Sequence, residues 1–501
     1  MSIVTCYPQL SPEEAASQIF HGATVAFSGF TNAGAAKLVP RALAARARDL
    51  HCKGEPFKLR VLTGASSGSF IDEPLAAAEA MSYRAPYQSG TTLRDQINNQ
   101  QVEYVDMHLS HLPQTVLEGF QGKIDFAVVE ATEITRDGRV YLTSSIGASP
   151  AYLKYADHVI IEINHYHSPR LREMADIMIL PSPPHRFPIP LHDPLTKLGY
   201  PYAVVDPRKV IAVLENDEAD NVPEFAPTDV HSERIAENVV RFLLDEMLAG
   251  RIPPDFLPLQ AGVGNVANGV MAALAANPYI PPFTMFTEVY QDSLVDLMEM
   301  GKLTAASTTS LTLTPEKLLH MYDNMDFFTP RIVLRPQELS NHPGVIKRLG
   351  VISMNTALEI DIYGNVNASH VYGTRIMNGI GGSGEFTRNA YISIYMCPSV
   401  AKGGKISAIV PMSPHIDNNE HSVQIVVTDQ GLADLRGLGP MQRAELIIER
   451  CAHPAYREYL RNYVKNSRVG HIRHNLEKAF ELHLNLMETG SMLPLDTVSG
   501  E

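Results

Sequence analysis

Short runs of apolar and β-branched residues alternate with longer stretches of helical periodicity along most of this chain. In the first half the apolar runs fall at residues 23–27, 59–64, 124–130, 159–164 and 210–214. Continuous apolar runs separated by helices are typical of buried strands in a mostly parallel sheet that is covered on both faces. The pattern therefore predicts an open α/β fold.

Local signals set the ends of several helices. Ser11 is a good N-cap and Pro12 follows it at the first helical position. A long amphipathic stretch covers residues 232–249 and stops at a glycine with prolines beyond it. The pattern is helical again from Met441 to the C-terminus. Prolines across residues 181–188 exclude helix and central strand there, so this segment is predicted to be irregular.

The alternation restarts after a polar break at residues 215–221. A glycine-rich turn at 260–268 leads into a predicted helix over 269–276. We place a boundary near residue 230 and predict two similar α/β domains, 1–230 and 231–501. Further strands are predicted in the second domain at residues 281–289, 305–311, 331–334, 390–396, 405–410 and 423–428, with a hairpin within 352–370.

Composition narrows the class of protein. The chain has 501 residues, of which 45% are hydrophobic and 19% charged, as in ordinary globular proteins. Its net charge of −14 argues against a nucleic-acid partner, since such proteins are normally basic. No apolar run reaches the ~18 to 20 residues of a membrane span, and the N-terminus lacks the pattern of a signal peptide. We expect a cytoplasmic protein that binds neither nucleic acid nor membrane.

The sequence gives little evidence for a metal site or for disulfide bonds. The sequence places no third histidine or carboxylate at helical spacing from His165 and His167, so we predict no metal site there. The cysteines form no CxxC pair and are expected to be reduced thiols. They are Cys6, Cys52, Cys397 and Cys451.

Two segments are candidates for chemistry. Residues 281–289 read as a buried strand with Glu288 near its end, and an ionised carboxylate in apolar surroundings is costly unless something binds it. The alternative is a strand-end acid that reaches solvent or pairs with an arginine. Residues 378–386 contain four glycines in nine positions, which permits close approach of the backbone to a ligand. The alternative here is a mobile loop.

An ordered set of motifs over nearly the whole chain resembles the acetyl-CoA hydrolase/transferase family of CoA-transferases. The motifs lie at residues 261–268, 287–289, 340–343, 352–355, 378–386 and 431–437. The resemblance implies two similar open α/β CoA-transferase domains with mostly parallel sheets. The second, 231–501, would carry the catalytic glutamate.

The resemblance also implies a covalent mechanism. The family glutamate that matches Glu288 attacks an acyl-CoA, and an enzyme-bound glutamyl-CoA thioester follows. Asn341 and the backbone N–H of Gly382 would be the oxyanion donors. The expected donors are propionyl-, succinyl- or acetyl-CoA, and the expected acceptors are succinate or acetate. Coenzyme A would be substrate and covalent intermediate, so no permanently bound cofactor and no metal are expected.

Contacts to coenzyme A are carried over from the family in the same way. They fall on Val263, Gly264, Asn265, Val266, Ala267, Leu358, Asn378, Gly382 and Lys402. Relatives usually have glutamate where this chain has Asp429, close to the active site. The segment near Asn221 lacks an arginine that some relatives carry. Each departure is a candidate determinant of which carboxylate is accepted.

Three functions remain open at the level of sequence. The first is CoA transfer, the second is hydrolysis of the same intermediate by water, and the third is non-catalytic binding of acyl-CoA. The combination of Glu288, Asn341 and the glycine cluster argues against the third, since a binder needs no nucleophile. Transfer and hydrolysis differ in the exclusion of water, which the sequence leaves undecided. The expected partners are acyl-CoA, small carboxylic acids and a second copy of the chain in a homodimer.

Overall fold

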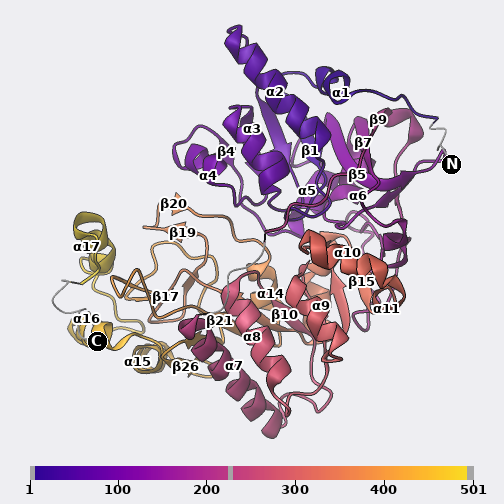
Figure 1. The fold of residues 1–501 in the computed structure, drawn as a ribbon. Helices are drawn as coiled ribbons and strands as arrows, with labels where there is room; N and C mark the ends of the chain where they lie inside the picture. Colours follow the sequence, from indigo (N-terminus) through magenta and orange to yellow (C-terminus); the bar gives the residue numbers. More distant parts are fainter. Residues whose placement is uncertain (1–5, 224–228, 494–501) are drawn as a thin grey trace. The chain divides into compact units, whose positions relative to one another are not determined.

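The structure, a computed structural model, describes residues 6–223 and 229–493, which divide into two compact units (Figure 1). Unit 1 comprises residues 6–223 with Thr284–Val345 and Asn378–Gly382. Unit 2 comprises residues 229–283 with Ile346–Met377 and residues 383–493. Each unit is described by itself below.

The main sheet of unit 1 follows the order β4-β3-β2-β1-β5-β6-β8, and β7 pairs with both β5 and β9. Pairing is parallel except where β6 meets β5 and β8. This confirms the predicted mostly parallel sheet. The strands are β1 (Thr24–Phe27), β2 (Leu59–Leu62), β3 (Met81–Ala85), β4 (Glu103–Tyr104), β5 (Phe126–Ile134), β6 (Arg139–Leu142), β7 (His158–Asn164), β8 (Ala203–Val204) and β9 (Val210–Asn216).

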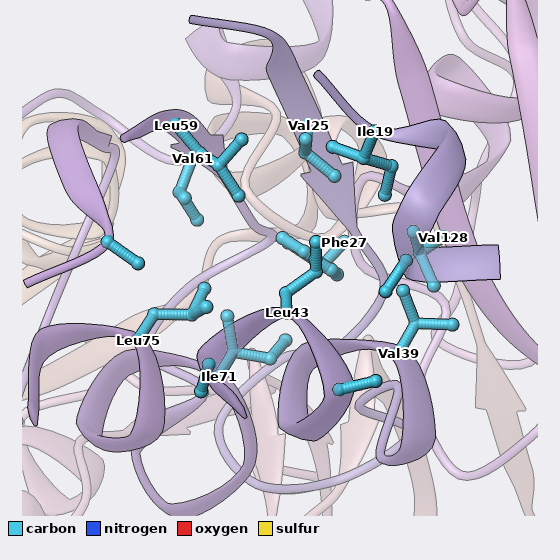
Figure 2. Close-up of a cluster of buried hydrophobic side chains, with 14 of the residues drawn as sticks. Ile19, Val25, Phe27, Val39, Leu43, Leu59, Val61, Ile71, Leu75 and Val128 are labelled. Carbon is cyan, nitrogen blue, oxygen red and sulfur yellow. The ribbon is translucent and has the colours of Figure 1, made fainter. Parts of the chain in front are cut away.

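Helices pack on this sheet through an aliphatic core. Ser11 caps α1 (Pro12–Gln18) as predicted, since its side chain accepts the Glu14 N–H. Helix α2 (Leu38–Cys52) buries its apolar stripe, as does α3 (Glu73–Ala77). Figure 2 shows side chains of these helices directed toward those of the strands, among them Val39, Leu43, Leu75, Val25, Phe27 and Val61. The other helices of the N-terminal segment are α4 (Thr91–Asn98), α5 (His111–Leu117) and α6 (Ser149–Tyr155).

Residues 284–345 group with the N-terminal segment because backbone hydrogen bonds join them. The Ile146 N–H donates to the Thr309 carbonyl at 2.9 Å, and the Asp176 N–H donates to the Leu334 carbonyl at 2.8 Å. Each compact unit is therefore built from several separate segments of the chain. The division into two sequence domains at about residue 230 stays a prediction. The elements here are β11 (Phe283–Phe286), β12 (Val289–Tyr290), α9 (Asp292–Glu299), β13 (Leu303–Thr308), β14 (Ser310–Leu311), α10 (Pro315–Asp323), α11 (Met325–Phe328), β15 (Ile332–Leu334), α12 (Gln337–Ser340) and α13 (Pro343–Leu349).

Unit 2 repeats the α/β plan around the strand order β10-β16-β21-β25-β26, parallel except for the last pair. A predicted hairpin is confirmed where β17 (Glu359–Asp361) pairs antiparallel with β18 (Val366–Asn367). The larger elements are α7 (Val230–Leu248), β10 (Leu259–Ala261), α8 (Asn265–Ala276), β16 (Ile352–Thr356), α14 (Ser383–Asn389), β21 (Ile392–Met396), β25 (Ile425–Thr428), β26 (Gly431–Asp434), α15 (Pro440–Arg450), α16 (Pro454–Asn466) and α17 (Glu481–Thr489).

Two details qualify the predictions. Helix α8 begins at Asn265, four positions before the expected start, because the turn that precedes it closes at Gly264 with φ of 125°. Residues 181–188 form neither helix nor strand in the described chain, as their prolines predicted. Every described helix is too short or too polar to cross a lipid bilayer.

Candidate active site

Glu288 lies in unit 1, in the break between β11 and β12. Its backbone carbonyl accepts hydrogen bonds from Thr308 Oγ1 at 2.7 Å and from the Thr309 N–H at 3.0 Å. These bonds to the end of the neighbouring strand fix the peptide that carries the carboxylate. The residue is therefore held by the sheet rather than by a free loop.

Asn341 brings its side-chain amide to that carboxylate. The residue is fully buried and forms the C-cap of α12, where its own N–H donates to the Gln337 carbonyl at 2.9 Å. From this position Asn341 Nδ2 donates a hydrogen bond to Glu288 Oε1. The fold thus brings together two of the predicted site residues that are 53 positions apart in the sequence.

Gly382 completes the arrangement by having no side chain. A Cβ at this position would overlap both Oε1 and the carboxyl carbon of Glu288. It would also press on the Asn341 amide. The backbone of Gly382 therefore lies against the carboxylate at a distance that only glycine allows.

The electrostatic state of Glu288 follows from its surroundings. Burial raises the pKa of the Glu288 carboxyl to about 7, because a charge in an apolar site loses its hydration. The hydrogen bond from Asn341 acts in the opposite direction and offsets only part of this rise. A carboxyl that titrates near neutral pH beside fixed donors is a candidate functional group.

The residue after Glu288 belongs to a buried apolar cluster. Val289, the next residue along the chain, is buried in a small cluster with Phe30, Ala65 and Leu109. Tyr87 packs against the same cluster.

Three residues that hold the glycine segment were missed by sequence reasoning. Tyr104 and Asp106 bond to residues 378–380, and the Tyr87 ring lies within 3.4 Å of where a Cβ on Gly381 would be. Tyr104 and Asp106 each lie 274 positions from the residue they bond to. No local motif marks any of the three, so only a fold-level contact prediction would have found them.

Most of the residues predicted to contact coenzyme A lie in unit 2, whereas Glu288 lies in unit 1. Val263 and Leu358 are 45% and 40% exposed, and Lys402 is exposed in the turn between β22 (Val400–Ala401) and β23 (Ile406–Ser407). Asn378 and Gly382, by contrast, belong to unit 1 with the glutamate. The residues at the start of α8 are Val263, Gly264, Asn265, Val266 and Ala267.

Asp429 also lies in unit 2, at the end of β25, and its carboxylate is engaged within that unit. It accepts the Ser399 N–H at 2.5 Å and the Gln430 Nε2–H at 2.9 Å, and His231 Nδ1 lies 3.2 Å away. Burial opposes ionisation, but these partners hold the pKa of Asp429 below its usual range. A cavity of about 470 Å³ in unit 2 is lined in part by Asp429 and Gln430.

The polar segment before residue 221 contains a buried charge that the sequence did not reveal. Asp220 lies 3.0 Å from the Lys37 ammonium, which is also 2.5 Å from Glu130. His167 Nε2 lies 3.1 Å from Glu130, and the two carboxylates outweigh burial and raise the pKa of His167 to about 9. Because Lys37 already supplies a cation between these carboxylates, the cluster is a buried salt-bridge network.

Two family models match this chain. Residues 3–215 match the acetyl-CoA hydrolase/transferase N-terminal domain, and residues 319–464 match the acetyl-CoA hydrolase/transferase C-terminal domain. Together these matches span well over half of the sequence.

Curated relatives match over nearly the full length. The chain is 53% identical to the propanoyl-CoA:succinate CoA transferase of Escherichia coli, covering 98% of this chain and 99% of the relative. It is 43% identical to the succinyl-CoA:acetate CoA-transferase of Clostridium kluyveri, covering 96% and 90%.

A solved structure shows the same fold at lower identity. The 4-hydroxybutyrate CoA-transferase of Porphyromonas gingivalis aligns with a TM-score of 0.62 and 22% identity, covering 91% of this chain and 97% of the other. The α/β plan found above is thus that of a CoA-transferase. From the two family models and the full-length relatives, this chain belongs to the acetyl-CoA hydrolase/transferase family and is a CoA-transferase.

Proposed function

We propose that this protein moves coenzyme A from propionyl-, succinyl- or acetyl-CoA to succinate or acetate, through a glutamyl-CoA thioester on Glu288. The observation that carries the proposal is the contact of one carboxylate with two fixed groups. Asn341 donates to Glu288, and the Gly382 backbone lies where any side chain would overlap it. The substrates are taken from the activities of the two relatives.

The reaction begins with the ionised carboxylate of Glu288. One of its oxygens attacks the acyl carbonyl carbon, the carbon–sulfur bond breaks, and the CoA thiolate departs, leaving a mixed acyl-glutamyl anhydride. The thiolate then attacks the Glu288 carbonyl carbon, which breaks the anhydride bond and releases the first acid as a carboxylate. The glutamyl-CoA thioester remains, and the acceptor carboxylate reverses both steps. No net proton is transferred in the cycle.

Each step passes through an oxyanion next to Glu288, on the substrate or on the glutamyl carbon. We assign Asn341 Nδ2 and the Gly382 N–H as donors to these oxyanions. Donors that are already fixed need no reorganisation as the charge develops, and one such donor contributes about 10²- to 10³-fold in rate. The hydrogen bond from Asn341 to the resting carboxylate supports this assignment.

Binding of coenzyme A is assigned, on the same proposal, to the turn before α8 and to the two residues of unit 1. The N-terminus of α8, with Gly264 before it, offers backbone N–H groups suited to a phosphate. Leu358 and Lys402 would add apolar and ionic contacts, and Asn378 and Gly382 would act beside Glu288. Coenzyme A is then substrate and covalent intermediate, with no cofactor held between turnovers. A homodimer in the cytoplasm completes the proposal.

Mass spectrometry of the intact protein tests the covalent step. Exposure to acyl-CoA without acceptor should add the mass of coenzyme A to the wild type, and succinate or acetate should remove it. Borohydride should reduce the thioester to an alcohol and abolish activity. The Glu288→Gln variant should show no adduct. Glu338→Gln is a matched control, because Glu338 is another buried acid of unit 1 whose pKa burial raises to about 7, and it should still form the adduct.

Two results would contradict the proposal. Full activity after borohydride treatment would exclude Glu288 as the covalent carrier. Steady release of free CoA and acid without any acceptor, at the rate of the complete reaction, would instead identify a thioesterase.

A further inference from the structure

We propose that Asp106 and Tyr104 are positioning residues for the reaction, because they hold the glycine segment 378–382 so that Gly382 stays against Glu288. This inference rests on the proposed function of Glu288 and Gly382. Tyr104 is the last residue of β4 and Asp106 follows it two positions later, and both lie in unit 1 with the glycine segment. Their hydrogen bonds go to backbone groups of residues 378 and 380, in the segment whose Gly382 lies against the Glu288 carboxylate.

Asp106 holds the middle of the segment. The Ile380 N–H donates to both carboxylate oxygens of Asp106, at 2.9 Å and 3.1 Å. A hydrogen bond to an ionised acceptor is roughly twice as strong as one between neutral groups. The bonded amide is two residues from Gly382, so the position of one peptide strongly limits the position of the other.

Tyr104 holds the start of the segment. Its hydroxyl donates to the Asn378 carbonyl at 2.7 Å. Burial raises the pKa of Tyr104 well above its usual value, so the phenol stays protonated and remains a donor at every working pH. Asp106 and Tyr104 together bind backbone groups on both sides of Gly379.

Packing at Gly379 shows how closely the segment approaches these residues. A Cβ on Gly379 would lie 2.8 Å from both the Tyr104 hydroxyl oxygen and Asp106 Oδ1, and 2.9 Å from Tyr87 Cδ2. Such distances are too short for ordinary contact, so only glycine permits this fit. The glycine segment is therefore packed against Tyr104, Asp106 and Tyr87. This differs from the mobile loop that the sequence left as an alternative.

The geometry predicts a specific kinetic defect when the hydrogen bonds of Asp106 and Tyr104 to the glycine segment are weakened. A displacement of about 1 Å at a reacting centre costs about 10²-fold in rate. The Gly382 N–H is proposed to act on oxyanions, which exist only in the transition states and intermediates. Losing its alignment should lower kcat and kcat/KM by the same factor and leave KM unchanged.

The test compares Asp106→Ala, Asp106→Asn and Tyr104→Phe with a matched control. Asp125→Asn is the control, because Asp125 also accepts a backbone N–H, that of Thr24 at 2.9 Å, in the same unit. We expect kcat to fall about 10- to 100-fold in Asp106→Ala and about 3- to 10-fold in Tyr104→Phe, with KM constant. Asp106→Asn keeps one acceptor oxygen and should recover part of the loss. The control should keep wild-type kcat.

A second measurement separates positioning from folding. The rate of glutamyl-CoA formation should fall in Asp106→Ala by the same factor as kcat, while its melting temperature stays close to that of Asp125→Asn. Adding Gly379→Ala to Asp106→Ala should cost less than the product of the two single effects, since both disturb one contact.

The possible failures are distinct. If the wild type forms the adduct and Asp106→Ala forms it equally fast, or loses only affinity, the positioning role is overturned and the proposed function stands. If the wild type forms no adduct, the proposed function fails and this inference falls with it.

Discussion

The side-chain amide of Asn341 donates a hydrogen bond to the carboxylate of Glu288, whose pKa burial raises to about 7. The two residues are 53 positions apart in the sequence and meet where a broken strand faces the end of a short helix. This pairing joins a buried carboxyl with a raised pKa to a neutral donor, and several measurable consequences depend on it.

The first prediction concerns pH. If Glu288 attacks as the carboxylate, kcat/KM should rise tenfold per pH unit below about pH 7 and level off above it. Because the Asn341 hydrogen bond lowers this pKa, Asn341→Ala should move the midpoint to higher pH. Initial rates at low acyl-CoA concentration from pH 5 to 9 measure both effects. A flat profile across pH 6 to 8 would show that Glu288 does not titrate there.

The second prediction concerns stability. The folded pKa of Glu288 lies above its unfolded value, so folding is opposed once pH exceeds about 4.5, increasingly up to about 7 and constantly above it. Glu288→Gln removes the ionisation and should raise the melting temperature at pH 8 but change it little at pH 4. Thermal unfolding at both pH values checks this.

Glu246→Gln provides a control of opposite sign for that measurement. Hydrogen bonds from Arg251 and then Arg436 lower the pKa of Glu246 to about 2. A lowered pKa adds stability above the unfolded value, and that stability is lost as pH falls toward 2. Glu246→Gln should therefore lower the melting temperature at pH 8. If the melting temperatures of both variants shift in the same direction by the same amount, titration of these carboxyls is not the cause.

The third prediction separates the two proposed oxyanion donors, Asn341 and Gly382. Asn341→Ala should lower kcat about 10²- to 10³-fold, the usual loss for one donor. Gly382→Ala should be at least as damaging, because its Cβ would overlap the Glu288 carboxylate. Adduct formation followed by mass spectrometry reports both. A loss confined to KM in Asn341→Ala would mean that the amide only positions substrate.

Much of the fold was predictable because its signals are local. The cap at Ser11 and the buried runs of β5, β7 and β9 depend on neighbouring residues, and the structure confirms them. The interleaving of the units was not predictable, since it depends on backbone bonds such as that from Ile146 to Thr309. The motifs around Glu288, Asn341 and Gly382 pointed to one site by family likeness. The contacts of Tyr104 and Asp106 leave no mark in sequence, because they involve single backbone groups far along the chain.

The last prediction concerns the choice of acceptor acid. The family resemblance places Asp429 where relatives usually have glutamate. Its carboxylate accepts the Ser399 N–H at 2.5 Å within unit 2. Asp429→Glu extends the side chain by one methylene, about 1.5 Å, which breaks this short bond or pushes the carboxylate toward the neighbouring cavity. One methylene in a pocket is worth about 1–3 kcal/mol, so the preference for acetate over succinate should change roughly 10-fold or more.

Competition assays with both acids in wild type and Asp429→Glu measure that ratio directly. Ser399→Ala is the matched control, since it removes the hydroxyl that donates to Asp429 at 3.2 Å but keeps the backbone donor and the length of the acid. If the position of the carboxylate selects the acceptor, Ser399→Ala should change the ratio much less than Asp429→Glu. Identical ratios in all three proteins would make Asp429 a structural residue that holds Ser399, and would move the search for selectivity to the residues around Glu288.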